Sequence, residues 1–345
     1  MTATTPSGHP RVISPFAIEK NDAKVPGLAG GNVMLSQLVA RRILVIRWRR
    51  TISSGPTRHK PAAIAAIVAT TILWSLTTST ANAAPKSKPN QIQYEYVAPK
   101  NPAHQAIHDQ MKQGRALEHL QELLGPLRLP YPLTIKVAGC DGVINAWYND
   151  EVITVCYELL AEILKNAPPK DLPIGISRAD TVLGPVLAVF LHETAHAVFN
   201  MLQIPVLGRE EDAADQFAAY VMLRLSKDEA RRMILGSAYH HTVQIPGPQT
   251  TVSVRSFSDD HSTPAQRMYN ILCIGYGADK KLFADVVEKD FLPKDRAEVC
   301  DREYDDVDFA MTKLIGPHID KAQAKKFHEV WTRTVSARRA KLARQ

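Results

Sequence analysis

Apolar residues recur every three or four positions along most of the chain after residue 100, and they alternate with polar residues in one short stretch. The first spacing is typical of helices with one buried face, and the second of β-strands. Strands are expected at Leu133–Ala138 and, as a hairpin around Asn149-Asp150, at Val143–Tyr148 and Val152–Cys156. Helices are expected over His104–Leu124, Tyr157–Ala167, Arg178–Leu202, Glu211–Leu225, Ser226–Leu235, Pro264–Tyr276, Asp279–Val287, Lys294–Ile315 and Ala322–Val335. The pattern predicts an α+β fold that is mainly helical, with a small β-sheet.

Two interruptions of this pattern indicate a helix break and a long loop. Gly184-Pro185 falls inside Arg178–Leu202. Because proline removes a helix hydrogen bond, we expect a kink or a new helix start there. Tyr239–Asp260 is polar, contains Pro and Gly, and has no clear period. A loop of that length is often a lid or a substrate-contacting segment, and we expect one here.

The first 83 residues have the features of a targeting leader. Residues 1–60 predict a disordered extension ending in a basic region, unless the true start lies downstream, for example at Met34. Residues 61–83 contain an uncharged apolar run closed by Ala81-Asn82-Ala83, which predicts a signal peptide cleaved before Ala84. Since the run approaches the length that crosses a bilayer, an uncleaved membrane anchor is the alternative. We therefore expect an exported protein, periplasmic or secreted, that contacts a membrane only if the leader is retained.

Composition divides the remaining residues into three parts. Residues 84–102 are rich in Pro, Lys and Gln and predict a linker, 103–337 carry the helix and strand patterns of one domain, and 338–345 form a basic tail. The formal net charge of +7 belongs to the leader, because residues 1–83 hold ten bases and two acids, a net of +8, which leaves −1 for the rest. The expected domain is therefore not basic, and we expect no nucleic-acid partner.

The chain has four cysteines, and all of them follow the expected cleavage site. An even number in an exported protein predicts disulfides. Proximity in sequence favours Cys140–Cys156 and Cys273–Cys300, although four cysteines allow three connectivities. A cysteine zinc site is less favoured, since the chain contains no C-x-x-C pair.

The pattern His192-Glu193-Thr194-Ala195-His196 lies within an apolar helical segment. Histidines four residues apart lie on one helix face, so both imidazoles can reach one metal ion. The pattern alone also occurs by chance in ordinary surface helices, but here the flanking residues are apolar, and burying two histidines and a glutamate is costly unless they are paired or bind a metal. We expect His192 and His196 to be ligands of one zinc ion, Zn²⁺, and Glu193 to be a catalytic group.

A zinc hydrolase site needs a third protein ligand, and the acidic segment after the motif supplies candidates. Glu211 is the preferred ligand, because Asp215 follows one helical turn later and can hold a ligating histidine by its other ring nitrogen. Glu210 is the alternative, but Ala214, one turn beyond it, offers no such partner.

Further candidates flank the motif. A strand containing Asn145, Ala146, Trp147 and Tyr148 could line the cleft and bind an extended peptide by backbone pairing, although Trp147 and Tyr148 also suit a strand core. His261 precedes a helix and is a candidate hydrogen-bond donor to the transition state, with helix capping as the alternative role. Tyr269 is a weaker candidate for the same function.

These motifs together resemble known metallopeptidases. His192-Glu193-x-x-His196 with Glu211-x-x-x-Asp215 is similar to the gluzincin pattern of thermolysin-like enzymes, and Asn145-Ala146-Trp147-Tyr148 resembles their substrate-binding edge strand. The interval between His196 and Glu211 is shorter than in thermolysin, so the connecting segment must differ. The wider set resembles the DUF4344 metallopeptidase family over about residues 95 to 320: Cys140-Asp141-Gly142, Gly208–Asp215, His261 and Tyr269–Cys273. The resemblance implies a zincin-like domain whose edge strand flanks the active-site helix.

The expected function is peptide hydrolysis by a zinc-dependent metalloendopeptidase acting on a peptide or protein. Zinc would activate a bound water, Glu193 would act as general base, and zinc with His261 would stabilise the oxyanion. The alternative is a catalytically silent zinc protein of the cell envelope that binds partners. Glu193 argues against it, because a structural zinc site does not need an unliganded carboxylate beside the metal.

Overall fold

A four-stranded mixed sheet forms the first part of the fold in the computed structural model, which describes residues 91–247, 250 and 253–329. The strands are β1 (Ile92–Tyr96), β2 (Leu133–Ala138), β3 (Ala146–Asn149) and β4 (Val152–Cys156), and their order is β1-β2-β4-β3. β2 pairs in parallel with both β1 and β4, and β3 pairs antiparallel with β4. β3 is therefore an edge strand, as the sequence predicted.

The strand β1 corrects one expectation. It lies inside 84–102, which the composition assigned to a linker, so the folded part starts earlier than residue 103. Only Ile92 of β1 is buried, and the strand is held by its register with β2, from Ile92 opposite Leu133 to Tyr96 opposite Val137. The leader over 1–83 and the tail over 338–345 lie outside the described residues.

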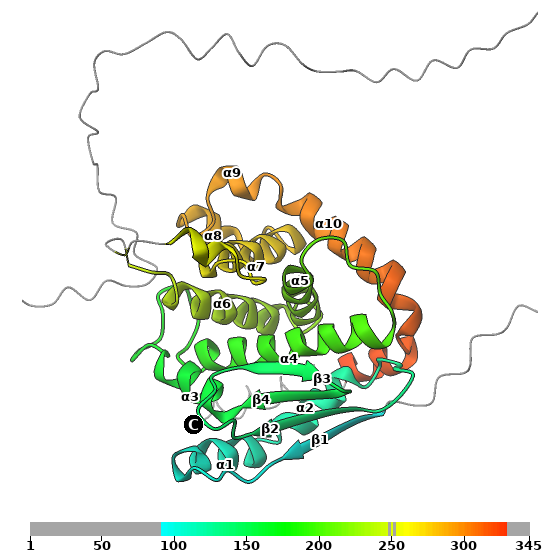
Figure 1. Cartoon of the computed structure of the whole chain (residues 1–345). Coiled ribbons are helices and arrows are strands. Elements are labelled where there is room, and N and C mark those ends of the chain that lie inside the picture. Colours follow the sequence, from blue (N-terminus) through cyan, green and yellow to red (C-terminus); the bar gives the residue numbers. More distant parts are fainter. Residues whose placement is uncertain (1–90, 248–249, 251–252, 330–345) are drawn as a thin grey trace, which may run out of the picture. The chain divides into compact units, whose positions relative to one another are not determined.

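Three helices accompany the sheet. The expected helix over His104–Leu124 is two helices, α1 (Gln105–Gln113) and α2 (Ala116–Leu124), because Gly114 ends the first and Arg115 turns the chain with a φ of 53°. α3 (Tyr157–Lys165) follows β4 directly. α2 packs against β1 and α3 against β4. In Figure 1, α1 lies on the opposite side of the sheet from α4 (Asp180–Met201).

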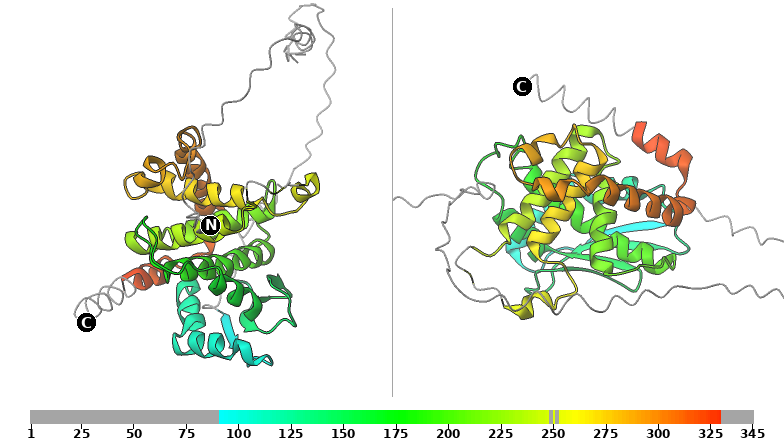
Figure 2. Two further views of the ribbon diagram at one scale, coloured as in Figure 1. Left: turned by 90° about the vertical axis from the view of Figure 1, so that its left-hand side faces the viewer. Right: turned by 90° about the horizontal axis from the view of Figure 1, so that it is seen from above.

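Four longer helices form the rest of the core. They are α4, α5 (Glu210–Met222), α6 (Lys227–Val243) and α7 (Pro264–Ala278). α4 packs on α5 and α6, and α6 packs on α7. Seen from the side, α4, α6 and α7, coloured green to yellow, follow one another as successive layers (Figure 2). α4 also contacts β3, so it lies between the sheet and the other helices.

The structure corrects two expectations about these helices. α4 is continuous through Gly184 and Pro185, which leaves the kink and excludes the new helix start as interpretations of that dipeptide. Gly184 instead permits a close crossing of α4 and α6, because a Cβ there would lie 2.7 Å from the backbone oxygen of Met233. α6 does not end before Tyr239 but continues to Val243, and irregular chain with one short turn, η2 (Val254–Phe257), joins it to α7.

In the part of the chain that the structure describes, α4 is the single helix long and apolar enough, by length and composition, to cross a membrane. In its most apolar window 61% of the residues are buried inside the protein. Its packing against β3, α5 and α6 accounts for that apolar composition, as in the central helix of a globular domain.

The C-terminal segments are shorter than the sequence suggested. They comprise α8 (Ala284–Glu288), α9 (Lys294–Ala297), α10 (Cys300–Ala310), the π-helical turn η3 (Met311–Ile315) and the 3₁₀ turn η4 (Gly316–His318). Residues 321–329 are helical, and the remainder of the helix expected to Val335 lies outside the described residues. The Cys273–Cys300 disulfide joins α7 to α10.

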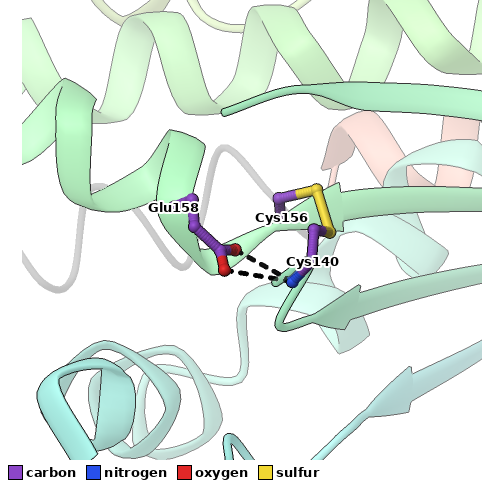
Figure 3. Close-up of side chains that lie close together, drawn as sticks. All are labelled: Cys140, Cys156 and Glu158. Carbon is purple, nitrogen blue, oxygen red and sulfur yellow. Dashed lines mark hydrogen bonds between the residues drawn. A yellow bond between two sulfur atoms is a disulfide. The ribbon is translucent and has the colours of Figure 1, made fainter. Parts of the chain in front are cut away.

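A second disulfide, Cys140–Cys156, joins the end of β4 to the loop after β2, so both pairings favoured by sequence proximity are present. The Glu158 carboxylate lies beside this disulfide and accepts hydrogen bonds from the backbone N–H group of Cys140 (Figure 3). It also accepts one from the backbone N–H group of Gly142. These contacts fix the loop that leads into β3. The hairpin from β3 to β4 turns at Asp150 and Glu151, whose φ values of 48° and 57° suit the right-handed twist of the strands.

Candidate metal centre and cleft

The helix α4 presents His192, Glu193 and His196 toward α5. The histidines are one turn apart and therefore share a face, with ring centroids 4.9 Å apart. His192 and Glu193 are buried, at 6% and 7% exposure. Burial of two such groups requires partners of opposite charge or a metal ion.

The helix α5 supplies those partners from its first two turns. Glu211 Oε2 lies 2.9 Å from His192 Nε2 and 3.5 Å from His196 Nε2, and the two Nε2 atoms are 3.2 Å apart. Ligand atoms bound to one tetrahedral zinc ion at normal bond lengths lie about 3.3 Å from one another. The three separations therefore suit a single metal ion, and two histidines with one glutamate are a ligand set that catalytic zinc uses.

The other ring nitrogens of both histidines contact carboxylates. His192 Nδ1 donates to Asp215 Oδ1 at 2.9 Å, and His196 Nδ1 donates to Glu210 Oε1 at 2.8 Å. Because a carboxylate only accepts, each contact keeps a proton on Nδ1. Nε2 then either carries a second proton and donates to Glu211 or, without that proton, has a lone pair that can bind a metal ion. This is the position expected for Asp215. Glu210, the alternative ligand, instead contacts the Nδ1 of His196, a role that the sequence did not indicate.

The charges at the centre shift the pKa values of these groups in opposite directions. Burial alone would lower the pKa of His192, but hydrogen bonds to Asp215 and Glu211 raise it. Burial would also lower the pKa of His196, but its contacts with Glu211 and Glu210 raise that pKa to about 9. The pKa of Glu211 is lowered, because hydrogen bonds from three histidines outweigh its burial. The site therefore favours positive charge between these side chains, and a bound metal would replace the protons that supply it.

Arg267 is a residue that the sequence analysis missed. It comes from α7, and its Nε and Nη2 donate to the two oxygens of Asp215, both at 2.7 Å. The ion pair is mostly enclosed, since the side chains are 22% and 12% exposed. Burial would raise the pKa of Asp215, but contacts with His192 and Arg267 lower it. An arginine within the otherwise uncharged helix expected at 264–276 was the available signal for this pair.

His261 lies at the mouth of the centre. Its Nε2 is 2.8 Å from Glu211 Oε2, and its ring stacks on that of His192 with centroids 5.9 Å apart. Nδ1 faces Asp260 at 3.0 Å. The contact with Glu211 raises the pKa of His261 to about 9 against the effect of burial. Atoms of His192, Glu211 and His261 lie within 4.8 Å of one another, so His261 is close enough to contact a bound metal or its substrate.

Glu193 differs from the other acids of the centre. Within the described part of the chain no residue hydrogen-bonds its carboxylate, and burial raises its pKa despite the neighbouring histidines. It lines two cavities: a cleft of about 560 Å³ beside β3 and an inner pocket of about 150 Å³ between α4 and α6. Glu193 can therefore exchange a proton with a molecule in the cleft.

The cleft is bounded on one side by the edge strand β3. Asn145, Ala146, Trp147 and Tyr148 all line it, together with His192, Glu193 and His196. Ala146 is buried, while Trp147 is 39% exposed, and the Tyr148 hydroxyl donates to Asn200 at the end of α4 at 3.0 Å. β3 pairs with β4 along one edge, and its other edge is at the margin of the sheet. Tyr269 lines neither the cleft nor the inner pocket.

One family model matches the chain. It is that of DUF4344, described as "Putative metallopeptidase", and it matches residues 96–315. That range includes β3, α4, α5, His261 and Arg267. No curated protein and no solved structure matches the chain.

Proposed function

The chain belongs to the DUF4344 metallopeptidase family, and from this membership and the geometry of the centre we propose that it is an exported, zinc-dependent endopeptidase. The observation that carries the proposal is the convergence of three electron-pair donors. The Nε2 atoms of His192 and His196 and an oxygen of Glu211 lie within 3.5 Å of one another, while carboxylates hold the Nδ1 protons. Without the Nε2 protons, three acceptors at such distances repel one another unless a metal cation lies between them.

His192, His196 and Glu211 are the residues that would hold the zinc ion. Three protein ligands are the usual number at catalytic zinc, whereas structural sites use four. When bound, zinc supplies Lewis acidity toward a water molecule and a substrate carbonyl. Asp215 and Glu210 fix the tautomer and the ring orientation of the two histidines, which typically strengthens metal binding 10–100-fold.

Glu193 is proposed as the general base. Its carboxylate has no hydrogen-bond partner among the described residues, faces the cleft and follows His192 directly. It would accept a proton from the attacking water and donate it to the departing amine. Burial raises its pKa, which brings the carboxyl group closer to the range in which it can both accept and release a proton.

His261 and β3 are proposed to bind the substrate. His261 Nε2 lies next to Glu211 and can donate a hydrogen bond to the carbonyl oxygen as negative charge develops there. Asp260 contacts Nδ1 and orients the ring. The outer edge of β3 offers backbone groups to an extended peptide. Asn145 and Ala146 line both cavities, as Glu193 does.

Export is proposed from the leader and the cysteines. All four cysteines are paired in the described residues, and disulfides persist in oxidising compartments such as the periplasm or the cell exterior. The leader pattern over 61–83 predicts removal before Ala84. N-terminal sequencing of the exported protein distinguishes cleavage from a retained membrane anchor.

Removal of the metal tests the proposed activity. Treatment with a chelator is expected to abolish cleavage of internally quenched peptides, because the Lewis acidity of the metal ion is lost. Equimolar zinc is expected to restore cleavage, because the three ligands remain in place in the folded protein. The peptide products are identified by mass spectrometry. Cleavage that persists after metal analysis shows the ion to be absent would contradict a metal-dependent mechanism.

A further inference from the structure

The inner pocket lies beside the catalytic centre but deeper in the helical core. It encloses about 150 Å³ and shares Asn145, Ala146, His192, Glu193 and His261 with the cleft. A cavity of this volume, engineered in another protein, accommodates benzene, a group of six heavy atoms. The pocket is therefore large enough for one amino-acid side chain of moderate size, and it is continuous with the residues that would perform hydrolysis.

One wall of the pocket is a polar stripe on α6. It consists of Ser237, His240, His241 and Gln244, whose spacing of three and four residues places them on one helix face. The close crossing of α4 and α6 brings this face toward His192. A Cβ on Gly236 would lie 2.1 Å from the backbone oxygen of Asp180, so the two backbones touch just before the stripe begins.

The stripe contains polar groups that lack partners. His241 is 6% exposed, and neither of its ring nitrogens hydrogen-bonds to a residue that the structure describes. Ser237 is 1% exposed, and its hydroxyl likewise has no hydrogen bond within the described ranges. His240 differs, because its Nε2 is 2.9 Å from the Gln244 amide nitrogen. Buried polar groups in native proteins are nearly always hydrogen-bonded, so the buried Nδ1 of His241 indicates a bound partner, and the Ser237 hydroxyl is free to bind the same group.

The charges around the pocket disfavour an anionic occupant. Asp215 and Arg267 both line it but neutralise each other, and Glu193 would repel an anion. Burial lowers the pKa of His240 to about 4 and holds the pKa of His241 well below its usual value, so both rings are neutral near pH 7. The groups left for a ligand are a hydroxyl and an imidazole, which can hydrogen-bond but cannot neutralise a charge.

We propose that the inner pocket is the specificity pocket of the peptidase and that it takes an uncharged polar side chain, such as asparagine, glutamine or threonine, from a residue flanking the scissile bond. The proposal rests on the proposed peptidase function and adds the substrate class. An amide or hydroxyl both donates and accepts, so it can satisfy Ser237 and His241 together. An apolar side chain of the same shape would leave both groups unpaired in a closed site, which is how polar pockets reject such analogues.

Isosteric peptide pairs test the proposal. Peptides that differ only by Asn against Leu, or Thr against Val, are compared at each position flanking the cleaved bond. At one position the wild-type protein is expected to favour the polar member by about tenfold or more in kcat/KM. Asp against Asn at the same position should favour Asn. A ratio near one, or a preference for Leu and Val, would overturn the proposal while leaving peptidase activity established.

Two variants assign the preference to the stripe. Ser237→Ala removes one hydroxyl with little change in volume, and His241→Phe removes both ring nitrogens. Each variant is expected to reduce the ratio of kcat/KM for the Asn peptide to kcat/KM for the Leu peptide several-fold, chiefly through slower cleavage of the Asn peptide. His119→Phe, the same exchange on α2 and outside both cavities, should leave the ratio unchanged. If the ratio is unaltered in both stripe variants, with metal content and melting temperature retained, the pocket does not select the side chain.

Binding measurements separate this proposal from the proposed function. The Glu193→Gln variant is titrated calorimetrically with the same peptide pairs, and the Asn peptide is expected to bind about tenfold more tightly than the Leu peptide. Equal affinities would overturn the proposed pocket whether or not the wild-type protein hydrolyses peptides. Selective binding without any hydrolysis by the wild-type protein would support the pocket and contradict the peptidase.

Discussion

Replacing Glu193 with glutamine is expected to lower kcat for peptide hydrolysis about a thousandfold, because the amide cannot accept the proton of the attacking water. Glutamine has nearly the same shape, and the carboxylate that it replaces has no hydrogen bond within the described residues to lose. The variant should therefore fold, bind metal as the wild type does, and melt at the same or a higher temperature. Steady-state kinetics on a fluorogenic peptide and metal analysis of the same sample measure both properties.

Glu162→Gln is the matched control for this substitution. Glu162 lies on α3, where it pairs with Lys165, and it lines neither the cleft nor the inner pocket. This variant should keep full activity. If Glu193→Gln also kept kcat within a few-fold of the wild-type value, Glu193 would not be the general base.

Replacing Arg267 with methionine is expected to lower the free energy of unfolding by about 3 kcal/mol. Methionine fills a similar volume, but it leaves the enclosed Asp215 carboxylate without the two hydrogen bonds from the guanidinium. This loss of unfolding free energy should fall at the lower end of the range for broken buried ion pairs, because Asp215 keeps its hydrogen bond from His192. Urea unfolding followed by circular dichroism, on metal-free protein, measures the change.

Arg224→Met provides the comparison on the protein surface. Arg224 also pairs with an aspartate, Asp308 at 2.7 Å, but the two side chains are 51% and 44% exposed. Removing such a pair should cost less than about 1 kcal/mol. If both variants lost the same unfolding free energy, burial would not make the Asp215–Arg267 pair more important for stability than the exposed pair.

The elements that follow simple periodicity could be predicted from the sequence. The α+β class, the β3–β4 hairpin, α3, α4 and α7 are present where the spacing of apolar residues places them. β1 could not be found this way, because four of its five residues are not buried and its stability comes from pairing with β2, about forty residues away in the chain. The split between α1 and α2 depends on a single residue, Arg115, in a left-handed conformation.

The end of α6 shows a different limit of sequence reasoning. Tyr239–Val243 belongs to a helix, but its polar composition is typical of a loop. Its histidines face an internal polar pocket, so the usual rule that core-facing helix positions are apolar does not apply. The same composition that led to the expected loop is the basis for the proposed specificity pocket.

The candidate site was more predictable than its supporting contacts. Helical spacing was enough to bring His192 and His196 together, and the acidic start of α5 places Glu211 and Asp215 beside them. Glu210 and Arg267 required the structure, although their contacts also run between helices. Glu211 and Asp215 are marked by their spacing of one helical turn, whereas no such pairing within one helix marks Glu210 or Arg267.

The most direct test of the metal centre is the zinc content of the purified protein, measured by elemental analysis beside Glu193→Gln and Glu211→Ala. We expect one zinc ion per chain in the wild type and in Glu193→Gln, and loss of zinc in Glu211→Ala, because only the last variant lacks a ligand. A wild-type protein that contains no zinc after metal-replete purification at neutral pH would show that His192, His196 and Glu211 do not form a zinc site, and would remove the basis for metal-dependent hydrolysis.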